Sequence, residues 1–392
     1  MEDYIQIKEK KDCVGCRACE KICPQKAIIM QEDEEGFIYP IVLDDKCVKC
    51  GICKKVCPLL NEVKKEKPLK TYAIKNKDEE CARKSTSAGI AYLFSKKIIE
   101  KNGCVFGSKL NKDMTVNQIE VTNLEGLDEI RGSKYIFSDT KETFVDVKNE
   151  LLKDKKVIYI GTPCQIAGLK SFLKKDFDNL YTIDFICHGV PSQKLFLKYI
   201  KYLEEKIRQS IIYYDFRNKE KKVWGNFCAK ILTNNNKNVY INANSDPYYY
   251  NFLKGNTYRE SCYDCKFAKK ERVSDITLGD FWGIELIDSN FYDDNGVSAV
   301  LINSEKGRKL FLELVNDIEF KEVLLDDILK KNKNLERPTE RKITRNNIYY
   351  GIDTLSPKKF VKKNLIIKNK VKNFIKTIIP IKIKNKIKKI LK

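Results

Sequence analysis

The stretch CVGCRACEKICP, residues 13–24, determines the fold of the first part of this 392-residue chain. Its four cysteines are separated by two, two and three residues, and a proline follows the last one. The same pattern returns 34 residues later, in residues 47–58, so the chain contains an internal repeat. Paired runs of this type bind two 4Fe–4S clusters, and the fourth cysteine of each run serves the other cluster. The repeat therefore predicts a small two-cluster ferredoxin domain.

Each predicted cluster takes three thiolates from one loop and one from the other loop. The first set of ligands is Cys13, Cys16, Cys19 and Cys57, and the second set is Cys47, Cys50, Cys53 and Cys23. Zinc sites also use pairs of cysteines two residues apart. Two quartets with a proline at the same place favour iron–sulfur clusters over zinc.

Composition indicates an ordinary globular protein, since 42% of its residues are hydrophobic and 33% are charged. The polar first residues do not resemble a signal peptide, and no apolar run reaches the roughly 18 residues of a membrane span. We therefore expect a cytoplasmic protein. Thiols stay reduced in that compartment, so the fifteen cysteines indicate metal or redox chemistry rather than disulfides.

The positive charge is concentrated at the C-terminus. The formal net charge is +21, and the 14 lysines of residues 357–392, which include no acid, leave +7 for the rest. The apolar residues that share one helical face there are Val361, Leu365, Ile367, Val371, Phe374, Ile375 and Ile378. A basic amphipathic helix of this kind favours peripheral contact with an anionic membrane surface, with a protein partner as the alternative. Few aromatic residues and no arginine after Arg345 argue against nucleic acid.

Residues 71–330 alternate between strand and helix patterns. Residues 155–160 and 180–186 are buried-strand patterns, and residues 88–101 and 166–173 are helical. The predicted fold class is α+β, a two-cluster ferredoxin domain followed by a mixed-sheet α/β core and a basic amphipathic tail. The expected boundaries are 1–61 for the ferredoxin domain, 62–70 for a linker, 71–150 and 151–330 for the two parts of the core, and 331–392 for a C-terminal extension.

Seven cysteines remain outside the repeat. Cys164 and Cys187 each follow a predicted strand, where α/β folds gather their sites, and Cys262 and Cys265 form a pair able to bind one metal. These four thiols could hold a third cluster or a zinc ion. Cys81, Cys104 and Cys228 are expected to be buried as small hydrophobic residues.

Six further motifs follow one another along the chain. They are STSAGI (85–90), GSKYIFSD (132–139), GTPCQIAGLK (161–170), DFICHGVPS (184–192), CYDCKFA (262–268) and DITLGDFWG (275–283). Together with the ferredoxin repeat they resemble the coenzyme F420 hydrogenase/dehydrogenase beta subunit family, over about residues 1–300. That resemblance implies a core that binds FAD. It also implies electron transfer between clusters, flavin and a diffusible two-electron carrier such as coenzyme F420. Similar bacterial proteins are often associated with genes for cell-surface polysaccharides.

The resemblance also implies site residues. It assigns Cys164, Cys187, Cys262 and Cys265 to a further 4Fe–4S cluster. It places the flavin beside Ser85, Thr86, Ser87, Gly89, Lys134, Tyr135, Gly161, Thr162 and Pro163. Ala88 stands where the family has a glycine, and its methyl group would crowd a phosphate that approaches the backbone.

From the residues alone, several of these positions have more than one interpretation. The small-residue loop at 85–89 offers backbone N–H groups to a phosphate or is an ordinary helix cap. Pro163 belongs to a ligand-binding turn or preorganises a first helical turn. His188, the only histidine, relays protons to a flavin, donates to a cluster sulfur or is structural. Lys134 is a cation beside a reduced flavin or its diphosphate, or an ordinary solvated surface lysine.

These observations predict an iron–sulfur flavoprotein oxidoreductase, with His188 and Lys134 as its catalytic candidates. The expected partners are a redox protein such as a ferredoxin and a small-molecule electron carrier. The alternative is a non-catalytic electron-transfer subunit of a larger redox complex, which could serve cell-surface polysaccharide synthesis.

Overall fold

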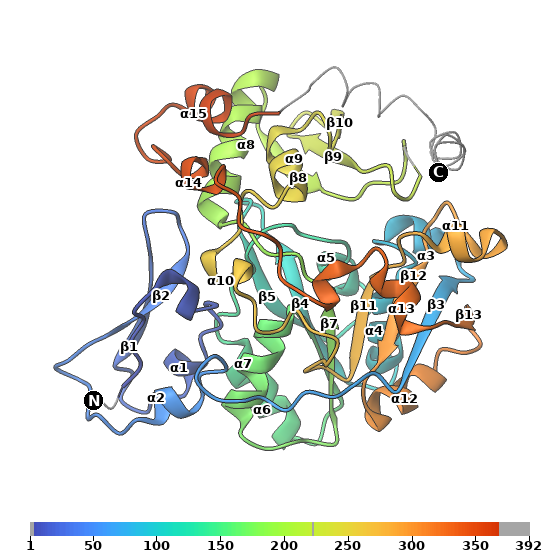
Figure 1. Ribbon diagram of the computed structural model, residues 1–392, viewed down its shortest axis with the longest axis horizontal. Helices are drawn as coiled ribbons and strands as arrows, with labels where there is room; N and C mark the ends of the chain where they lie inside the picture. The colour runs from blue at the N-terminus through green and yellow to red at the C-terminus, as the bar shows by residue number, and fades with distance from the viewer. Residues whose placement is uncertain (1–3, 222, 368–392) are drawn as a thin grey trace.

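The computed structural model describes residues 4–221 and 223–367 and shows a small cysteine-rich domain beside a larger α/β core (Figure 1). The fold class predicted for these residues is confirmed: a ferredoxin-like domain precedes a core built on one large mixed sheet. The tail part of that prediction begins inside the described residues, and most of it lies outside them.

The ferredoxin-like domain contains one antiparallel hairpin and two short helices. Strands β1 (Ile28–Glu32) and β2 (Ile38–Val42) pair, and helices α1 (Ala18–Lys21) and α2 (Ile52–Lys55) each carry the third cysteine of a repeat. The repeat extends to the backbone, because Gly15 and Lys49 occupy equivalent positions and both adopt positive φ. The two halves are therefore the same loop folded twice.

The core is an eight-stranded sheet in the order β13-β3-β12-β11-β7-β6-β4-β5. Its strands are β3 (Lys70–Asn76), β4 (Cys104–Leu110), β5 (Val116–Val121), β6 (Val157–Gly161), β7 (Leu180–Phe185), β11 (Ile276–Asp280), β12 (Ser298–Ile302) and β13 (Ile318–Glu322). Strands β4, β6, β7 and β11 run parallel, and the others are antiparallel to their neighbours. The carboxyl ends of the parallel strands therefore meet at one edge, where α/β folds place their sites.

Helices cover both faces of this sheet (Figure 1). Helices α4 (Ile90–Ile99) and α12 (Glu305–Leu312) pack on one face, and α6 (Thr143–Leu152) and α7 (Pro163–Leu173) pack on the other. Strand β6 has apolar side chains on both faces. Ile158 and Ile160 pack in the hydrophobic cluster with α4 and α12, and Val157 and Tyr159 pack in the cluster with α6 and α7. Successive side chains of a strand point to opposite faces of the sheet, so a strand that is apolar throughout is covered on both faces.

Helix α7 starts earlier than the sequence pattern indicates. We predicted a helix from residue 166, and the structure begins it at Pro163. Thr162 caps the helix in a capping box with Gln165, and a proline at the first helical position is already preorganised. As a result, Cys164 lies in the first turn of a helix rather than in the preceding loop.

A second, three-stranded sheet packs beside the core. Its strands are β8 (Ile211–Asp215), β9 (Cys228–Thr233) and β10 (Asn238–Asn242), flanked by α8 (Gln193–Ile207), α9 (Pro247–Leu253) and α15 (Pro357–Asn364). The remaining helices are α3 (Glu79–Lys84), α5 (Leu127–Ile130), α10 (Glu260–Tyr263), α11 (Ile284–Ile287), α13 (Leu325–Leu329) and α14 (Arg345–Ile348), with 3-10 turns at Lys10–Asp12, Ser289–Phe291 and Lys333–Leu335. Cys81, Cys104 and Cys228 are buried, as predicted.

The beginning of the basic tail is part of the folded core. Helix α15 packs against α8, and Phe360, Val361 and Leu365 are buried in the cluster that surrounds it. Val361 and Leu365, the first two residues of the predicted amphipathic face, are thus covered by protein, so a membrane-binding face cannot begin at residue 361. Residues from 368 onward lie outside the described part of the chain. Within that part, no helix is long and apolar enough to cross a membrane.

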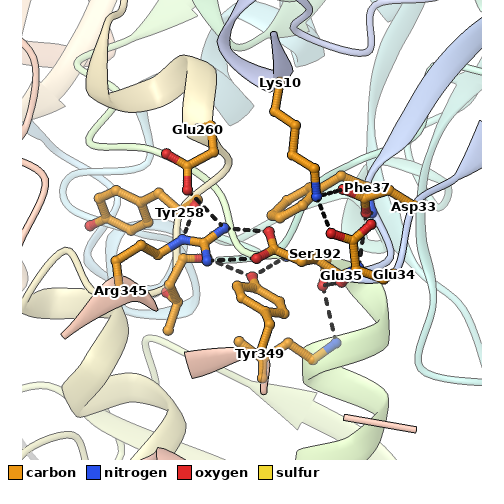
Figure 2. A network of polar contacts seen from close by, with 12 residues as sticks. Lys10, Asp33, Glu34, Glu35, Phe37, Ser192, Tyr258, Glu260, Arg345 and Tyr349 are labelled. Carbon is orange, nitrogen blue, oxygen red and sulfur yellow. Dashed lines mark hydrogen bonds and ion pairs between the residues drawn. The ribbon is translucent and has the colours of Figure 1, made fainter. Parts of the chain in front are cut away.

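Two buried arginines hold the ferredoxin-like domain on the core. Arg345, which is 1% exposed, binds both carboxylate oxygens of Glu35 at 2.9 and 2.5 Å and donates to the carbonyl of Tyr258 (Figure 2). Ser192 donates to the carbonyl of Glu35 at 2.6 Å. Arg259 donates to the carbonyls of Cys13 and Ile38 on the ferredoxin side. These contacts fix where the domain sits.

Candidate electron-transfer site

Twelve of the fifteen cysteines form three groups, which we call the first, second and third quartets. The first is Cys13, Cys16, Cys19 and Cys57; the second is Cys23, Cys47, Cys50 and Cys53; the third is Cys164, Cys187, Cys262 and Cys265.

All four thiols of the second quartet line one small cavity. Backbone N–H groups point at its sulfurs, since Ile5 donates to Cys53 at 3.2 Å and Ala27 donates to Cys23 at 3.3 Å. Such donors stabilise thiolate charge and tune the potential of a cluster. Cys23 thus lines the same cavity as the three cysteines of the later block.

The thiols of the first quartet also lie close together. Burial raises the pKa of Cys16 and Cys19, and the neighbouring thiols of Cys13 and Cys57 raise it further. The N–H of Gly15 donates to the Cys13 sulfur at 3.3 Å. A bound metal cluster would stabilise these buried thiols as thiolates, since a coordinating cation lowers the pKa of a thiol.

The third quartet comes from three separate segments that meet at the carboxyl edge of the sheet. Cys164 follows β6, Cys187 follows β7, and Cys262 and Cys265 lie in and just after α10. All four line one cavity of about 370 Å³ between the ferredoxin-like domain and the core. Burial raises the pKa of Cys164 to about 11 and of Cys262 to about 12, and other thiols of the quartet add to both shifts. Four converging thiols fit a metal centre.

The first and third quartets are neighbours. Gly168 lies on α7 one turn beyond Cys164, and a Cβ added to it would be 2.8 Å from the Cys16 sulfur. The Cys164 thiol also contributes to the raised pKa of Cys16. Glycine at position 168 therefore lets the helix that carries one quartet touch a ligand of the other.

Arg259 lies between these two quartets, and our sequence reasoning missed it. Its side chain is buried, with residue exposure of 1%, and its Nε donates to the Cys13 carbonyl at 2.7 Å while it lines the cavity of the third quartet. Its Nη1 has no hydrogen-bond partner among the described residues. The guanidinium opposes the rise in the pKa of Cys164 and Cys262. A single arginine near a cysteine pair was the only signal available in the sequence.

The loop at residues 85–89 is joined to the Lys134 segment. The backbone N–H of Ser133 donates to the Thr86 hydroxyl at 2.9 Å, and Ser298 donates to the Ser87 hydroxyl at 3.1 Å. Ser85 and Ser87 are buried. The predicted residues Ser85, Thr86, Ser87, Gly89, Lys134 and Tyr135 thus belong to two adjoining segments.

Two details of that loop differ from expectation. The backbone N–H of Ala88 donates to Ser298 and that of Gly89 to the Thr86 carbonyl, so these two amides are not free for a phosphate. The helix begins at Ile90, with Gly89 as its cap at a φ of 75°. The methyl group of Ala88 packs in the hydrophobic core, so it does not crowd the approach to the loop.

Lys134 and Tyr135 lie in different environments. The Lys134 ammonium donates to the carbonyl of Arg131 at 2.8 Å, and burial lowers its pKa to about 7. Tyr135 stacks on Phe252 with ring centroids 4.3 Å apart, and its hydroxyl accepts a hydrogen bond from Arg217 at 3.0 Å. Lys134 is therefore a cation whose charge a nearby anion would restore.

A buried polar network continues from Tyr135. Arg217 binds both carboxylate oxygens of Asp280 at 3.0 and 3.2 Å, and the Trp224 indole donates to the same carboxylate at 2.7 Å. Trp224 stacks on Trp282 with centroids 4.8 Å apart. Arg217 and Trp224 were not predicted, because nothing in the local sequence links them to Asp280.

The other predicted residues lie at the cavity of the third quartet or beside it. Thr162, Pro163 and His188 line this cavity, and Gly161 precedes them as the last residue of β6. The Thr162 hydroxyl is 3.1 Å from the Cys164 sulfur. Burial lowers the pKa of His188, and the carboxylate of Asp280 opposes that shift. His188 thus lies between the third quartet and the network of Arg217 and Asp280.

Comparison with known families agrees with this arrangement. Residues 154–327 match the C-terminal part of the beta subunit of coenzyme F420 hydrogenase/dehydrogenase, and residues 12–60 match a 4Fe–4S dicluster domain. Residues 154–327 therefore carry the C-terminal domain of the coenzyme F420 hydrogenase/dehydrogenase beta subunit family, and a 4Fe–4S ferredoxin domain precedes it at the N-terminus. The chain is therefore an iron–sulfur electron-transfer protein of the oxidoreductase class.

Among solved structures, a chain of the F420-reducing NiFe hydrogenase complex from Methanosarcina barkeri is similar at 17% identity and a TM-score of 0.48. The similarity covers 75% of the present chain and 97% of that one. No curated protein matches the sequence.

Proposed function

We propose that this protein is an iron–sulfur flavoprotein oxidoreductase. In this proposal electrons pass between the second quartet, the first quartet, the third quartet and FAD, and then to a two-electron carrier such as coenzyme F420. The observation that carries the proposal is the contact between Gly168 and Cys16, because it makes the first and third quartets neighbours. All three quartets would hold 4Fe–4S clusters.

Several contacts support FAD beside residues 85–89 and Lys134. The two segments are joined through Thr86 and Ser133, and the Lys134 ammonium donates to backbone carbonyls rather than to a carboxylate of the described residues. Burial lowers the pKa of Lys134 more than the Asp215 carboxylate raises it, so an anionic cofactor would add the stabilisation that the ammonium lacks. Bound FAD would supply the conversion between one-electron and two-electron transfer.

In this proposal Lys134 and His188 would serve a bound flavin from two different segments of the core. Lys134 compensates the charge of the cofactor, whereas His188 holds or moves a proton at its imidazole nitrogens. Burial lowers the pKa of His188, so the imidazole is neutral near neutral pH, with one nitrogen that donates and one that accepts a hydrogen bond. Gly161, Thr162 and Pro163, which lie at or beside the cavity of the third quartet, would help to hold the flavin.

Anaerobic reconstitution tests the proposal. The holoprotein should contain about twelve irons, about twelve sulfides and about one FAD per chain, since each quartet holds four irons. Cys164→Ser should remove about four irons, and Cys81→Ser, at a buried cysteine outside the quartets, should remove none. Zinc in the third quartet, or no bound flavin after reconstitution, would contradict the proposal.

The second candidate function is a non-catalytic electron-transfer subunit. The bonded amides of Ala88 and Gly89 favour it, because they leave fewer donors for a flavin phosphate. Such a subunit would be reduced fully by a donor protein and would turn over no small acceptor. Assays with coenzyme F420 and NAD(P)H under anaerobic conditions distinguish the two functions.

A further inference from the structure

The two halves of the ferredoxin repeat present the same loop to different surroundings. In the first half Cys16 is 8% exposed, and a Cβ on Gly15 would lie 3.1 Å from Phe137 and 3.2 Å from Arg259. In the second half the equivalent residues are Cys50, which is exposed, and Lys49. The core covers the first loop and leaves the second uncovered.

An apolar side chain marks this difference. Val14 packs against the core cluster that includes Cys16, whereas its counterpart Val48 is 62% exposed. Gly15 must be glycine, because it combines a φ of 71° with contacts from the core. Lys49 adopts a φ of 53° with a full side chain, at the conformational cost that such residues carry. Its side chain extends into solvent.

Charge on the covered loop shows what kind of surface it fits. Arg17 binds Asp139 of the core through two hydrogen bonds, at 2.5 and 2.8 Å, and Lys21 binds Glu142 at 2.5 Å. The covered loop is thus a basic surface docked on acidic side chains. The first loop of the repeat thus shows that this type of loop can bind an acidic surface through its basic side chains.

The uncovered loop is also basic. Lys46 precedes this loop and Lys49 and Lys55 lie in it, whereas Lys26 follows Cys23, the cysteine of the first run assigned to the second quartet. All four lysines are exposed, and none of them has an ion pair within the described residues. Lys55 is the counterpart of Lys21, which is paired in the first half. Asp44 and Asp45 are the exposed acids of the same segment. Each of the four lysines lies within three residues of a cysteine of the second quartet, which contains the exposed Cys50.

We propose that the surface formed by Lys26, Lys46, Val48, Lys49 and Lys55 is the electron entry site and binds a small acidic iron–sulfur carrier protein. This inference rests on the proposed function for the direction of transfer. One electron passes from the reduced cluster of the carrier to the cluster of the second quartet. The carrier is thereby oxidised and the acceptor cluster reduced, and no proton or bond changes at the surface. Acidic residues of the carrier pair with the lysines, and Val48 contacts its apolar centre.

The test compares two triple variants of the reconstituted holoprotein. Lys46→Glu, Lys49→Glu and Lys55→Glu reverse the charge of the proposed surface. Lys201→Glu, Lys358→Glu and Lys359→Glu change exposed lysines of α8 and α15 by the same net charge. The probe is an acidic two-cluster bacterial ferredoxin. Calorimetry gives its Kd in the oxidised state, and stopped-flow absorbance gives the rate at which the reduced form reduces the clusters.

At low ionic strength the first variant should bind at least about tenfold more weakly and lose most of the salt dependence, while the second stays within about twofold of the unchanged protein. Equal weakening in both variants, or none in the first, would overturn the proposal. Val48→Glu retains every lysine and should weaken binding in the same direction if the triple variant fails to load iron. Iron content and cluster reduction are measured without flavin, so a missing flavin would contradict the proposed function and leave this test intact.

Discussion

The Cα of Gly168 faces Cys16 so closely that a methyl group at position 168 would lie 2.8 Å from the cysteine sulfur and Cβ. This contact joins α7 to the loop before α1, which itself packs against α7, and it brings the first and third quartets together. Because α7 also carries Cys164 in its first turn, a single helix links ligands of both proposed clusters. The relative position of the two domains therefore governs electron transfer between them.

Gly168→Ala should push the two domains apart at this contact. The added methyl group would meet the Cys16 side chain, so we expect destabilisation of about 1–3 kcal/mol, the usual cost of overpacking. Electron transfer from the first to the third cluster should slow, as measured by freeze-quench EPR. Ser171→Ala, at a half-buried position of the same helix, is the control. An unchanged rate together with unchanged stability would show that the contact is loose.

The ion pair of Arg345 and Glu35 should contribute far more to the free energy of unfolding than an exposed ion pair does. Arg345→Met leaves the Glu35 carboxylate partly buried without its cation, and breaking a buried pair costs about 3–5 kcal/mol. Asp353→Ala, which removes the exposed pair with Lys194, should cost about 0–1 kcal/mol. Denaturant unfolding measures both free energies. Limited proteolysis of Arg345→Met should release the ferredoxin domain, whereas equal stabilities would contradict this role for the pair.

Arg259 should raise the midpoint potentials of the first and third clusters. Reduction adds negative charge to a cluster, and a buried guanidinium between the two stabilises that charge. Arg259→Gln should therefore make both potentials more negative and leave the second cluster unchanged. EPR-monitored redox titration measures all three. Arg308→Gln, at an exposed arginine of α12, is the control, and a uniform shift of all three clusters in Arg259→Gln would refute a local effect.

The cysteine spacing predicted more of the site than any other feature. It predicted all eight cysteines of the repeat, and the ends of β6 and β7 brought Cys164 and Cys187 to one edge because the two strands are parallel neighbours. The contacts of Arg217 and Trp224 with Asp280 could not be predicted from the sequence, because they depend on how the small sheet packs on the core. Helix α15 was also misjudged, because an amphipathic pattern does not say whether protein or membrane covers its apolar face.

FAD binding should depend on pH through Lys134. Burial lowers its pKa to about 7 in the free protein, so the ammonium is largely deprotonated above that pH. An anionic cofactor would raise this pKa, and binding would then take up a proton between the two values. The affinity for FAD should thus be highest below about pH 7 and fall toward about pH 9.

The conservative variant separates this effect from a general change in the loop. Lys134→Arg keeps a permanent charge, so it should bind FAD with an affinity that hardly changes over the same range. Calorimetry in buffers of different ionisation enthalpy gives the number of protons taken up. The same pH dependence in Lys134→Arg would assign the titration to another group.

Membrane contact through the basic tail can be tested without disturbing the core. Phe360, Val361 and Leu365 are buried against α8, so a chain ending at Ser356 would lose part of its hydrophobic core. A chain ending at Ile367 keeps α15 and removes ten of the 14 lysines of residues 357–392. With vesicles that contain anionic lipid, the full chain should float and the shortened chain should remain in solution. Because each lysine near such a surface contributes about 1 kcal/mol, about 0.5 M salt should also release the full chain. Equal flotation of both chains would remove the tail from membrane binding.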